Sequence, residues 1–209
     1  MRNKFQLSLK RGFDVAISVF GLLALIPLFA LIALCICIDS PGDVFFRLRA
    51  AGRDGKAFDQ WKFRTMVQNA RDTAHPFETS ATDPRITRVG RFLRRWSLDE
   101  LPQLWNIVRG DMSLVGPRPA FIEVAAGYSP LQARRLRMRP GLTGLAQLQG
   151  RNLLPWQQRV VLDTAYIDSY SLWLDLKILL RTIPVLVRGT GVYGADGTVK
   201  MHDLASFRK

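Results

Sequence analysis

The feature that most constrains this chain is an uncharged apolar run near its beginning. Residues 15–38, VAISVFGLLALIPLFALIALCICI, contain no acidic or basic side chain. As one helix, at about 1.5 Å per residue, the run would reach about 36 Å, which is enough to cross a bilayer core of about 30 Å. It is too long for a cleaved signal peptide, and no small-x-small cleavage site follows it. The run therefore predicts a membrane element that stays in the protein.

Pro27 lies in the middle of this run and leaves two arrangements open. Proline removes a backbone hydrogen bond and bends a helix, so the run is either a spanning helix with a mild kink or a hairpin that re-enters the same leaflet. Basic residues flank both ends of the run: Arg2, Lys4, Lys10 and Arg11 before it, and Arg47, Arg49, Arg53 and Lys56 after it. The positive-inside rule places both flanks in the cytoplasm, which favours a hairpin broken at Pro27.

The charge of the chain indicates polyanionic partners. It has 30 Lys and Arg against 17 Asp and Glu, a formal net charge of +13. Nucleic acid, an anionic membrane surface and phosphorylated substrates all fit such an excess, but no nucleic-acid-binding module is recognisable. The two histidines lie far from each other and from the two cysteines, which argues against a zinc site. A metal, if used, is expected to be a hard cation such as Mg²⁺.

Beyond the apolar run, the pattern predicts mostly helices with a short β element. Short extended pieces separated by glycine-containing turns are expected within residues 43–66. Helices are predicted at residues 67–75, 87–96, 98–109, 119–137, 155–169 and 171–188. Loops or turns are predicted at residues 76–86, 110–119 and 139–150. The expected fold class is therefore α+β and mostly helical.

Three parts of the chain are expected to differ in character. Residues 1–40 form the N-terminal segment and membrane hairpin, residues 41–190 a small domain, and residues 191–209 a polar tail. The helix at 171–188 combines Arg, Lys, Trp and Leu, which suits a helix lying in a membrane interface. Packing against the domain core is an equally good interpretation for any one such helix.

Two adjacent carboxylates, Asp99 and Glu100, follow an arginine-rich stretch. Ser97 and Glu100 have the spacing of a capping box, which would start a helix at Ser97 and give both carboxylates a structural role. Alternatively, Asp99 in the first turn of that helix could lie beside a bound phosphate and attack its phosphorus to form an acyl phosphate. Spacing alone favours the capping interpretation.

Several basic residues could hold phosphate. Arg118 lies between two prolines, and a guanidinium on so stiff a backbone suits bidentate phosphate binding, although a surface arginine in a proline turn is more common. Arg139 and Arg151 bracket a turn-rich stretch and could contact a diphosphate or lipid headgroups. Lys62 and Arg64 are ambiguous in the same way.

Taken together, these stretches resemble the monotopic polyprenyl-phosphate phosphoglycosyl transferases, also called bacterial sugar transferases, in their short form. The matching pieces follow the order of the family: LKRGFDV (9–15), the run containing Pro27, KFRTM (62–66), SLDELPQLWNIVRGDMSLVGPRP (97–119), RPGLTGLAQLQGRN (139–152) and LDLKILLRT (174–182). They cover nearly the whole chain, and the central piece is very specific. Gln149 departs from the pattern, since family members often carry Asn there.

The resemblance implies an enzyme that transfers a sugar-1-phosphate from a UDP-sugar to undecaprenyl phosphate and releases UMP. It implies that Asp99 is the nucleophile, that the transferred group passes through a covalent phospho-sugar on Asp99, and that Glu100 is its catalytic partner. Mg²⁺ is expected at Asp99 and Glu100. The phosphate-binding residues that the resemblance implies are Lys62, Arg94, Arg118 and Arg151.

The resemblance also implies a place in the cell. A re-entrant helix broken at Pro27 would anchor the catalytic domain, residues 41–190, on the cytoplasmic face of the bacterial inner membrane. Membrane lipids are then partners, a homodimer is compatible with the pattern, and nucleic acid is not expected. Such an enzyme would begin glycoconjugate or exopolysaccharide assembly. The alternative is a non-catalytic membrane scaffold of a glycan assembly complex, and neither the sugar nor the pathway follows from the sequence.

Overall fold

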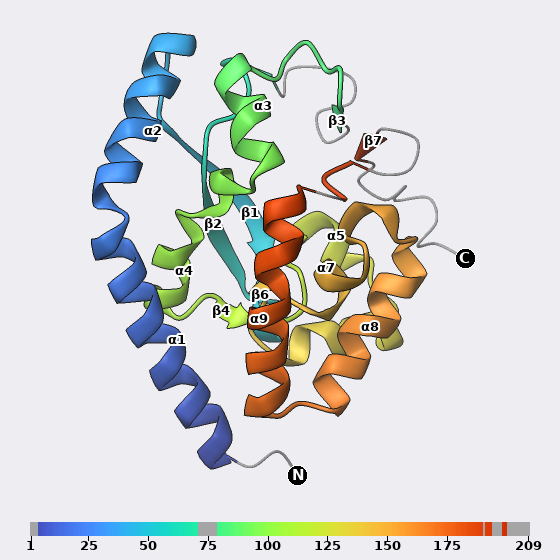
Figure 1. Cartoon of the computed structure of the whole chain (residues 1–209). Coiled ribbons are helices and arrows are strands. Elements are labelled where there is room, and N and C mark those ends of the chain that lie inside the picture. The colour runs from blue at the N-terminus through green and yellow to red at the C-terminus, as the bar shows by residue number, and fades with distance from the viewer. Residues whose placement is uncertain (1–3, 71–78, 190, 194–197, 200–209) are drawn as a thin grey trace.

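Helices dominate the computed structural model of the chain, which describes residues 4–70, 79–189, 191–193 and 198–199 (Figure 1). The sheets are small, so the expected mostly helical α+β class is confirmed. Most of the predicted polar tail, residues 191–209, lies outside the described residues. So does most of the predicted helix at 67–75, of which residues 68–70 form a turn.

The apolar run folds into two helices that meet at a sharp bend. Helix α1 (Lys4–Ala24) and helix α2 (Ile26–Asp39) are separated by Leu25 and bent by 60° (Figure 1). Pro27 is the second residue of α2, where the amide hydrogen that proline lacks would have no partner within the helix. The helix is therefore interrupted at Leu25, two residues before Pro27. Among the described residues, no single helix has the length and apolarity to cross a membrane, but the bent pair together does.

Helix α1 is attached to the rest of the protein by a buried polar network. The Lys10 Nζ lies 2.7 Å from Oδ2 of Asp175. Asp14 accepts a hydrogen bond from the Ser113 hydroxyl at 2.7 Å and another from the Leu114 amide at 3.1 Å. Lys10, Asp14 and Asp175 are all buried, so the position of α1 is fixed by charged groups rather than by apolar packing alone.

This network corrects the interpretation of two flanking charges. Arg11 donates hydrogen bonds to the carbonyl oxygens of Ile107 and Val108, at 2.6 and 3.0 Å. Lys10 and Arg11 thus bind the protein itself instead of serving only as charges beside a membrane. The remaining flanking residues still carry the argument from the positive-inside rule.

The extended pieces predicted within residues 43–66 form an antiparallel hairpin. Strand β1 (Phe45–Ala51) pairs with strand β2 (Ala57–Phe63), from Phe45 opposite Phe63 to Ala51 opposite Ala57. The connection is the 3₁₀ turn η1 (Arg53–Gly55). The short strand β5 (Ala120–Phe121) pairs with the other edge of β1 and gives the order β2-β1-β5.

Two of the predicted helices are broken. The stretch 98–109 is a 3₁₀ turn, η2 (Leu98–Glu100), followed by helix α4 (Gln103–Arg109), and Pro102 stands between them. The stretch 119–137 contains β5, helix α5 (Ile122–Ala126), helix α6 (Pro130–Ala133) and the 3₁₀ turn η3 (Arg134–Arg137). Pro130 keeps the preceding Ser129 extended, and Ser129 caps α6.

The other elements follow the prediction more closely. Helix α3 (Arg88–Arg95), helix α8 (Trp156–Asp168) and helix α9 (Leu172–Arg188) lie within the predicted helices at 87–96, 155–169 and 171–188. The predicted loops contain short pieces of structure, namely β3 (Thr79–Ser80), β4 (Ser113–Val115), β6 (Gly141–Thr143) and α7 (Leu145–Gln149). After α7 come η4 (Arg151–Leu153) and, near the end of the chain, β7 (Thr198–Val199), which pairs with β3.

A parallel strand pair and two hydrophobic clusters hold these elements together. Strands β4 and β6 pair in parallel, and a Cβ atom on Gly141 would lie 2.1 Å from the Gly116 nitrogen, so this approach requires glycine. The main cluster includes Ile107, Met112, Val115, Tyr166 and Ile178. A second cluster joins α2 to β2 and α3 through Ile32, Ile36, Phe63 and Leu93. Helix α2 therefore also packs on the domain.

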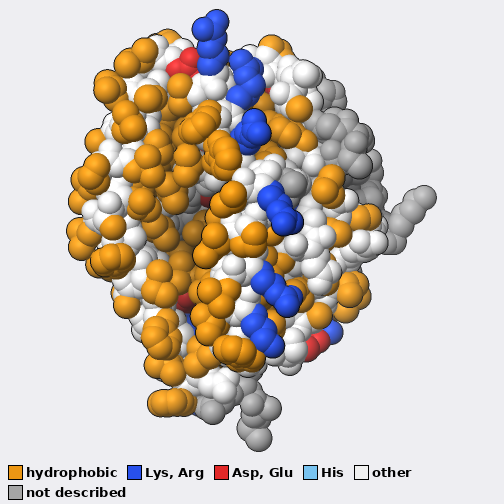
Figure 2. Space-filling model, in the orientation of Figure 1, with side chains coloured by type: hydrophobic (Ala, Val, Ile, Leu, Met, Phe, Trp, Pro, Cys, Tyr) orange, Lys and Arg blue, Asp and Glu red, His pale blue; other side chains and the backbone are white. Residues whose placement is uncertain are grey.

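A broad apolar surface covers one side of the molecule. Figure 2 shows hydrophobic side chains gathered over α1, α2 and α9, with a row of Lys and Arg side chains that runs over α3 and along α9. On α9 the exposed apolar residues are Trp173, Leu176, Leu180, Ile183 and Val187. An exposed apolar surface of this kind, bordered by basic residues, fits contact with a membrane.

Candidate active site

A cavity of about 620 Å³ brings the predicted site residues together. It is lined by Lys62, Arg94, Asp99, Glu100, Arg118 and Arg151, among others. These residues come from β2, α3, η2, the loop after β4, and η4. The volume is in the usual range for small-molecule sites, roughly 300–1,000 Å³. All six residues proposed from the sequence therefore share one cavity.

Arg139, another candidate from the sequence, and the carboxylate Asp111 are engaged elsewhere. Arg139 Nε donates to the carbonyl oxygen of Gly110 at 2.8 Å. Asp111 accepts from the Asn106 amide at 3.3 Å and lies 3.6 Å from Arg109 Nε. Arg64 does line the cavity, but its guanidinium donates to the carbonyl oxygens of Ser40 and Pro41. These contacts give the three residues structural roles.

Ser97 does not form the capping box that its spacing suggests. Its φ of 55° places it in the left-handed region, and its side chain makes no capping hydrogen bond. A non-glycine residue held there costs roughly 1–3 kcal/mol, and such strain is often found at functional sites. The Ser97 hydroxyl instead accepts a hydrogen bond from Arg151 Nη2 at 2.8 Å. The resulting tight turn carries Asp99 and Glu100 side by side in η2.

Glu100 is enclosed by two cations. Its Oε1 accepts hydrogen bonds from Lys62 Nζ at 2.7 Å and from Arg118 Nη2 at 2.8 Å, and Arg118 Nη1 lies 3.5 Å from Oε2. Burial alone would raise the pKa of Glu100, but the charges of Arg118 and Lys62 outweigh it and hold that pKa well below its ordinary value. Glu100 is therefore a carboxylate at every pH at which the protein would work.

Asp99 has a different environment although it is the neighbouring residue. Its Oδ2 lies 3.9 Å from Lys62 Nζ, which is too far for a hydrogen bond, and the residue is 8% exposed. Burial raises the pKa of Asp99 above its ordinary value, the Glu100 charge adds to this effect, and Lys62 opposes it.

The contrast between the two carboxylates divides their roles. Glu100 is fixed by Lys62 and Arg118, and both of its short hydrogen bonds use Oε1. Asp99 is desolvated and not held in a close ion pair, so its carboxylate is the more basic of the two and the better placed to react. This geometry supports Asp99 as a nucleophile and Glu100 as the group that positions the surrounding cations.

Arg94 and Arg151, two further cations of the cavity, each donate to a hydroxyl group. Arg94 Nε donates to the Thr65 hydroxyl at 2.9 Å, and Arg151 donates to Ser97 as described above. Burial lowers the pKa of Arg151 but leaves it a cation at neutral pH. A hydroxyl group does not neutralise a guanidinium, so these two hydrogen bonds are compatible with a role of both arginines in binding an anionic substrate group.

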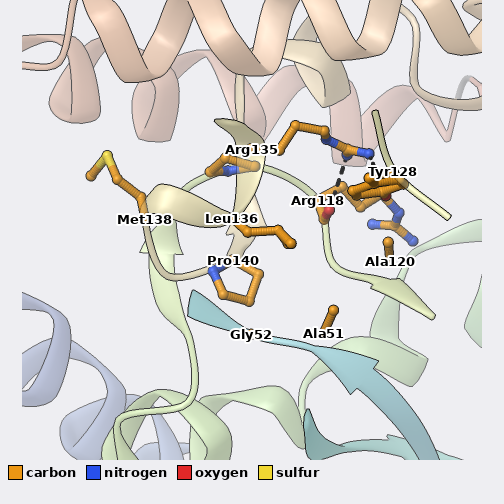
Figure 3. A pocket seen from close by; sticks show the side chains of 10 residues that line it. Ala51, Gly52, Arg118, Ala120, Tyr128, Arg135, Leu136, Met138 and Pro140 are labelled. Atoms are coloured by element: carbon orange, nitrogen blue, oxygen red, sulfur yellow. Dashed lines mark hydrogen bonds between the residues drawn. The ribbon is translucent and has the colours of Figure 1, made fainter. Parts of the chain in front are cut away.

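Arg135 supports the loop that carries Arg118, and sequence reasoning missed it. Its Nη2 donates to the Arg118 carbonyl oxygen at 3.2 Å and its Nη1 to the Tyr128 hydroxyl at 2.9 Å (Figure 3). These residues border a small cavity of about 10 Å³ beneath the loop. Asp163 lies 2.6 Å from Arg135 Nη2, and both residues are buried. Nothing in the stretch LQARRLRM (131–138) distinguishes the buried Arg135 from the more exposed Arg134 and Arg137.

The residues present fit a hard divalent cation only in part. Asp99 and Glu100 offer carboxylate oxygens, the ligands that Mg²⁺ prefers. Among the described residues, no group of three or more His, Cys, Asp or Glu side chains could hold a metal. Mg²⁺ in proteins usually takes one or two carboxylates and completes its coordination with substrate phosphates and water. The carboxylate pair is thus compatible with a metal that is bound together with a phosphorylated substrate.

Comparison with protein families gives one extensive match. The family model described as bacterial sugar transferase matches residues 5–189. Several curated proteins are also similar over most of the chain. An undecaprenyl-phosphate glucose phosphotransferase of Komagataeibacter xylinus is 47% identical over an alignment of 185 residues, with 83% of this chain and 35% of that protein covered.

Two further relatives are similar over a larger share of their own length. The exopolysaccharide production protein ExoY of Sinorhizobium fredii is 42% identical, with 88% of each chain covered. A UDP-glucose:undecaprenyl-phosphate glucose-1-phosphate transferase of Caulobacter vibrioides is 43% identical, over 88% of this chain and 72% of that protein. The chain therefore spans about a third of the length of the first relative, but most of the length of the other two.

Proposed function

This chain belongs to the bacterial sugar transferase family, and we propose that it transfers a sugar-1-phosphate from a UDP-sugar to undecaprenyl phosphate. The observation that carries the proposal is the pair of buried Asp99 and partly buried Glu100, which shares one cavity with Lys62, Arg94, Arg118 and Arg151. Such a cavity can bind a diphosphate and presents a carboxylate to it. The products are undecaprenyl diphosphate-sugar and UMP.

The first step is a displacement at the β-phosphorus of the donor. An Asp99 oxygen forms a bond to that phosphorus, and the bond to the oxygen that bridges the two phosphates breaks. UMP leaves with the bridging oxygen and its electron pair, and the sugar phosphate stays on Asp99 as an acyl phosphate. Lys62, Arg118 and Arg151 offset the negative charge on the phosphate oxygens.

The second step regenerates the enzyme. A phosphate oxygen of undecaprenyl phosphate attacks the phosphorus held on Asp99, and the acyl phosphate bond breaks. The sugar phosphate passes to the lipid and Asp99 becomes a carboxylate again. Glu100 keeps Lys62 and Arg118 in place through both steps.

A magnesium ion is part of this proposal. Asp99 and Glu100 would hold it, and it would supply positive charge beside the transferred phosphate.

The bent α1–α2 pair would enter and leave the cytoplasmic leaflet of the bacterial inner membrane, and α9 would lie in the headgroup region. The exposed apolar residues of α9 and its basic border support that orientation. The lipid substrate then lies at the depth of the nucleophile.

The test of the function is UMP release by the purified full chain in detergent. The assay contains Mg²⁺, undecaprenyl phosphate and one of a panel of UDP-sugars. We expect UMP release that depends on the lipid and is fastest with one sugar. No release from any donor of the panel would contradict the proposed function.

Chelation of divalent cations should stop the reaction. EDTA should lower UMP release at least about 100-fold, because the diphosphate of the donor would then lack several kcal/mol of charge stabilisation. Adding Mg²⁺ in excess of the chelator should restore the rate. An unchanged rate in EDTA would show that the basic residues alone neutralise the phosphates.

The pH dependence of the first step should report Asp99. Only the ionised carboxylate attacks, and burial raises its pKa, so the rate should fall tenfold per pH unit at acid pH values where an ordinary aspartate is still ionised. Single-turnover UMP release without lipid isolates this step, because the lipid phosphate itself titrates near pH 6. A rate that holds constant down to about pH 4 would contradict a raised pKa.

A further inference from the structure

Two buried side chains in the cavity wall carry polar atoms that the protein itself does not bind. Gln147 is 5% exposed, and among the described residues its Oε1 and Nε2 have no hydrogen-bond partner. Asp163 is 1% exposed, and the same holds for its Oδ1. Both residues line the cavity that contains Asp99. Buried polar atoms are nearly always hydrogen-bonded, so these atoms point to a ligand.

Both side chains are held in place by the surrounding protein. Arg135 contacts one carboxylate oxygen of Asp163. Its Nε lies 2.9 Å and its Nη2 2.6 Å from Oδ2, so neither contact involves Oδ1. Gln147 lies on α7, whose N-cap Gly144 packs closely on the backbone of Gly116. A Cβ atom on Gly144 would lie 3.0 Å from Gln147 Oε1. The polar atoms are therefore positioned before any ligand arrives, which lowers the cost of binding.

The number of unbound acceptors indicates the chemistry of the ligand. Oε1 of Gln147 and Oδ1 of Asp163 both require a donor, so the ligand must supply at least two donor hydrogens. The edge of a uracil base has one N–H group between two carbonyl oxygens. A sugar ring has several hydroxyl groups, and each is both donor and acceptor. The wall thus fits a polyhydroxylated ring better than a nucleobase.

Gln147 and Asp163 both lie near residues that are proposed to bind phosphate. Arg135 joins Asp163 to the carbonyl oxygen of Arg118. The segment after α7 carries Arg151, which binds Ser97 beside the catalytic turn. Asp163 is thus linked through Arg135 to the loop of Arg118, and Gln147 precedes Arg151 by one turn of chain. A ring attached to a phosphate at Asp99 would occupy the same cavity as Gln147 and Asp163.

We infer that Gln147 and Asp163 bind hydroxyl groups of the sugar that is transferred and so help to select the donor. This inference rests on the proposed function, because the sugar must be attached to the phosphate that Asp99 attacks. The ribose of the nucleotide also carries hydroxyl groups, so the experiment must separate the two rings.

The test is the variant Gln147→Met in the full-length protein. Methionine has nearly the size of glutamine and cannot form these hydrogen bonds. We expect kcat/KM for the preferred UDP-sugar to fall about 10–100-fold, with inhibition by UMP unchanged, since UMP contains the ribose but not the transferred sugar. For the unmodified protein, kcat/KM should be much lower with a donor analogue that lacks the bound hydroxyl than with the preferred UDP-sugar. For the variant, this difference in kcat/KM should be much smaller.

Two controls separate binding from folding. Gln149→Met changes an exposed glutamine on the same helix and should leave kcat/KM unchanged. The thermal midpoint of Gln147→Met without ligand should be equal to or above that of the unmodified protein, because a buried amide without partners is replaced by an apolar group.

Several outcomes would overturn the inference. Unchanged kcat/KM in an active Gln147→Met protein, or a lower thermal midpoint, would give Gln147 no role in binding the sugar. UMP inhibition weakened by the same factor as kcat/KM would assign the contact to the nucleotide. These results differ from failure of the proposed function, in which the unmodified protein itself would release no UMP.

Discussion

Replacing Asp99 with asparagine should lower UMP release at least about a thousand-fold, equivalent to about 4 kcal/mol of transition-state stabilisation. The amide has the shape of the carboxylate but no anionic oxygen that can attack phosphorus. The variant should fold at least as well as the unmodified protein, because burial disfavours the charge of Asp99 and the amide carries none. Single-turnover UMP release and thermal unfolding in detergent measure the two effects separately.

Asp111→Asn is the matched control for this experiment. It makes the same chemical change in a residue that binds Asn106 and Arg109 instead of taking part in the catalytic turn. Its rate should stay within a few-fold of that of the unmodified protein. Near-normal turnover by Asp99→Asn would rule out a covalent intermediate on Asp99.

Lys10→Met should destabilise the protein by about 3–5 kcal/mol, the usual cost of removing one partner from a buried ion pair. The variant leaves Asp175 and Asp14 buried without the ammonium group that lies 2.7 Å and 3.9 Å from them. Burial already raises the pKa of Asp175, while Lys10 and the Tyr166 hydroxyl oppose this effect. We expect a large decrease of the thermal midpoint in detergent, at about 2–4 °C per kcal/mol.

Two further variants test the cause of that loss. Lys4→Met removes an exposed lysine from the same helix and should change stability by at most about 0.5 kcal/mol. The double variant Lys10→Met/Asp175→Asn should recover part of the loss, because it no longer leaves the Asp175 charge buried without its partner. A double variant as unstable as the sum of its single changes would mean that the two residues act independently.

The structure brings the six candidate site residues together, while several of the elements around them differ from the prediction. All six candidate residues line one cavity, and they were identified through a family motif that reflects their chemistry. The hairpin of β1 and β2 and the helices α8 and α9 also follow from local patterns, because each is made of contacts between residues close in sequence.

The errors arise where distant contacts override local preference. Ser97 and Glu100 have the spacing of a capping box, but the backbone of Ser97 is in the left-handed region and its side chain caps no helix. The Ser97 hydroxyl instead accepts a hydrogen bond from Arg151, which lies 54 residues away. From the sequence, Lys10 is a basic residue that flanks the apolar run. In the structure it is buried and donates a hydrogen bond to Asp175, which lies 165 residues away. The strand pair β4–β6 is too short to carry a periodic signal and forms between two predicted loops. Such pairings are decided by tertiary structure.

The measurement that tests the central claim most directly is the intact mass of the protein after incubation with its UDP-sugar and Mg²⁺ in the absence of lipid. The account predicts a mass increase of one sugar phosphate, absent in Asp99→Asn, and its loss on addition of undecaprenyl phosphate. Full lipid-dependent turnover with no mass increase, under conditions in which an acyl phosphate survives, would contradict it. The lipid phosphate would then attack the donor directly, and Asp99 would not be the nucleophile.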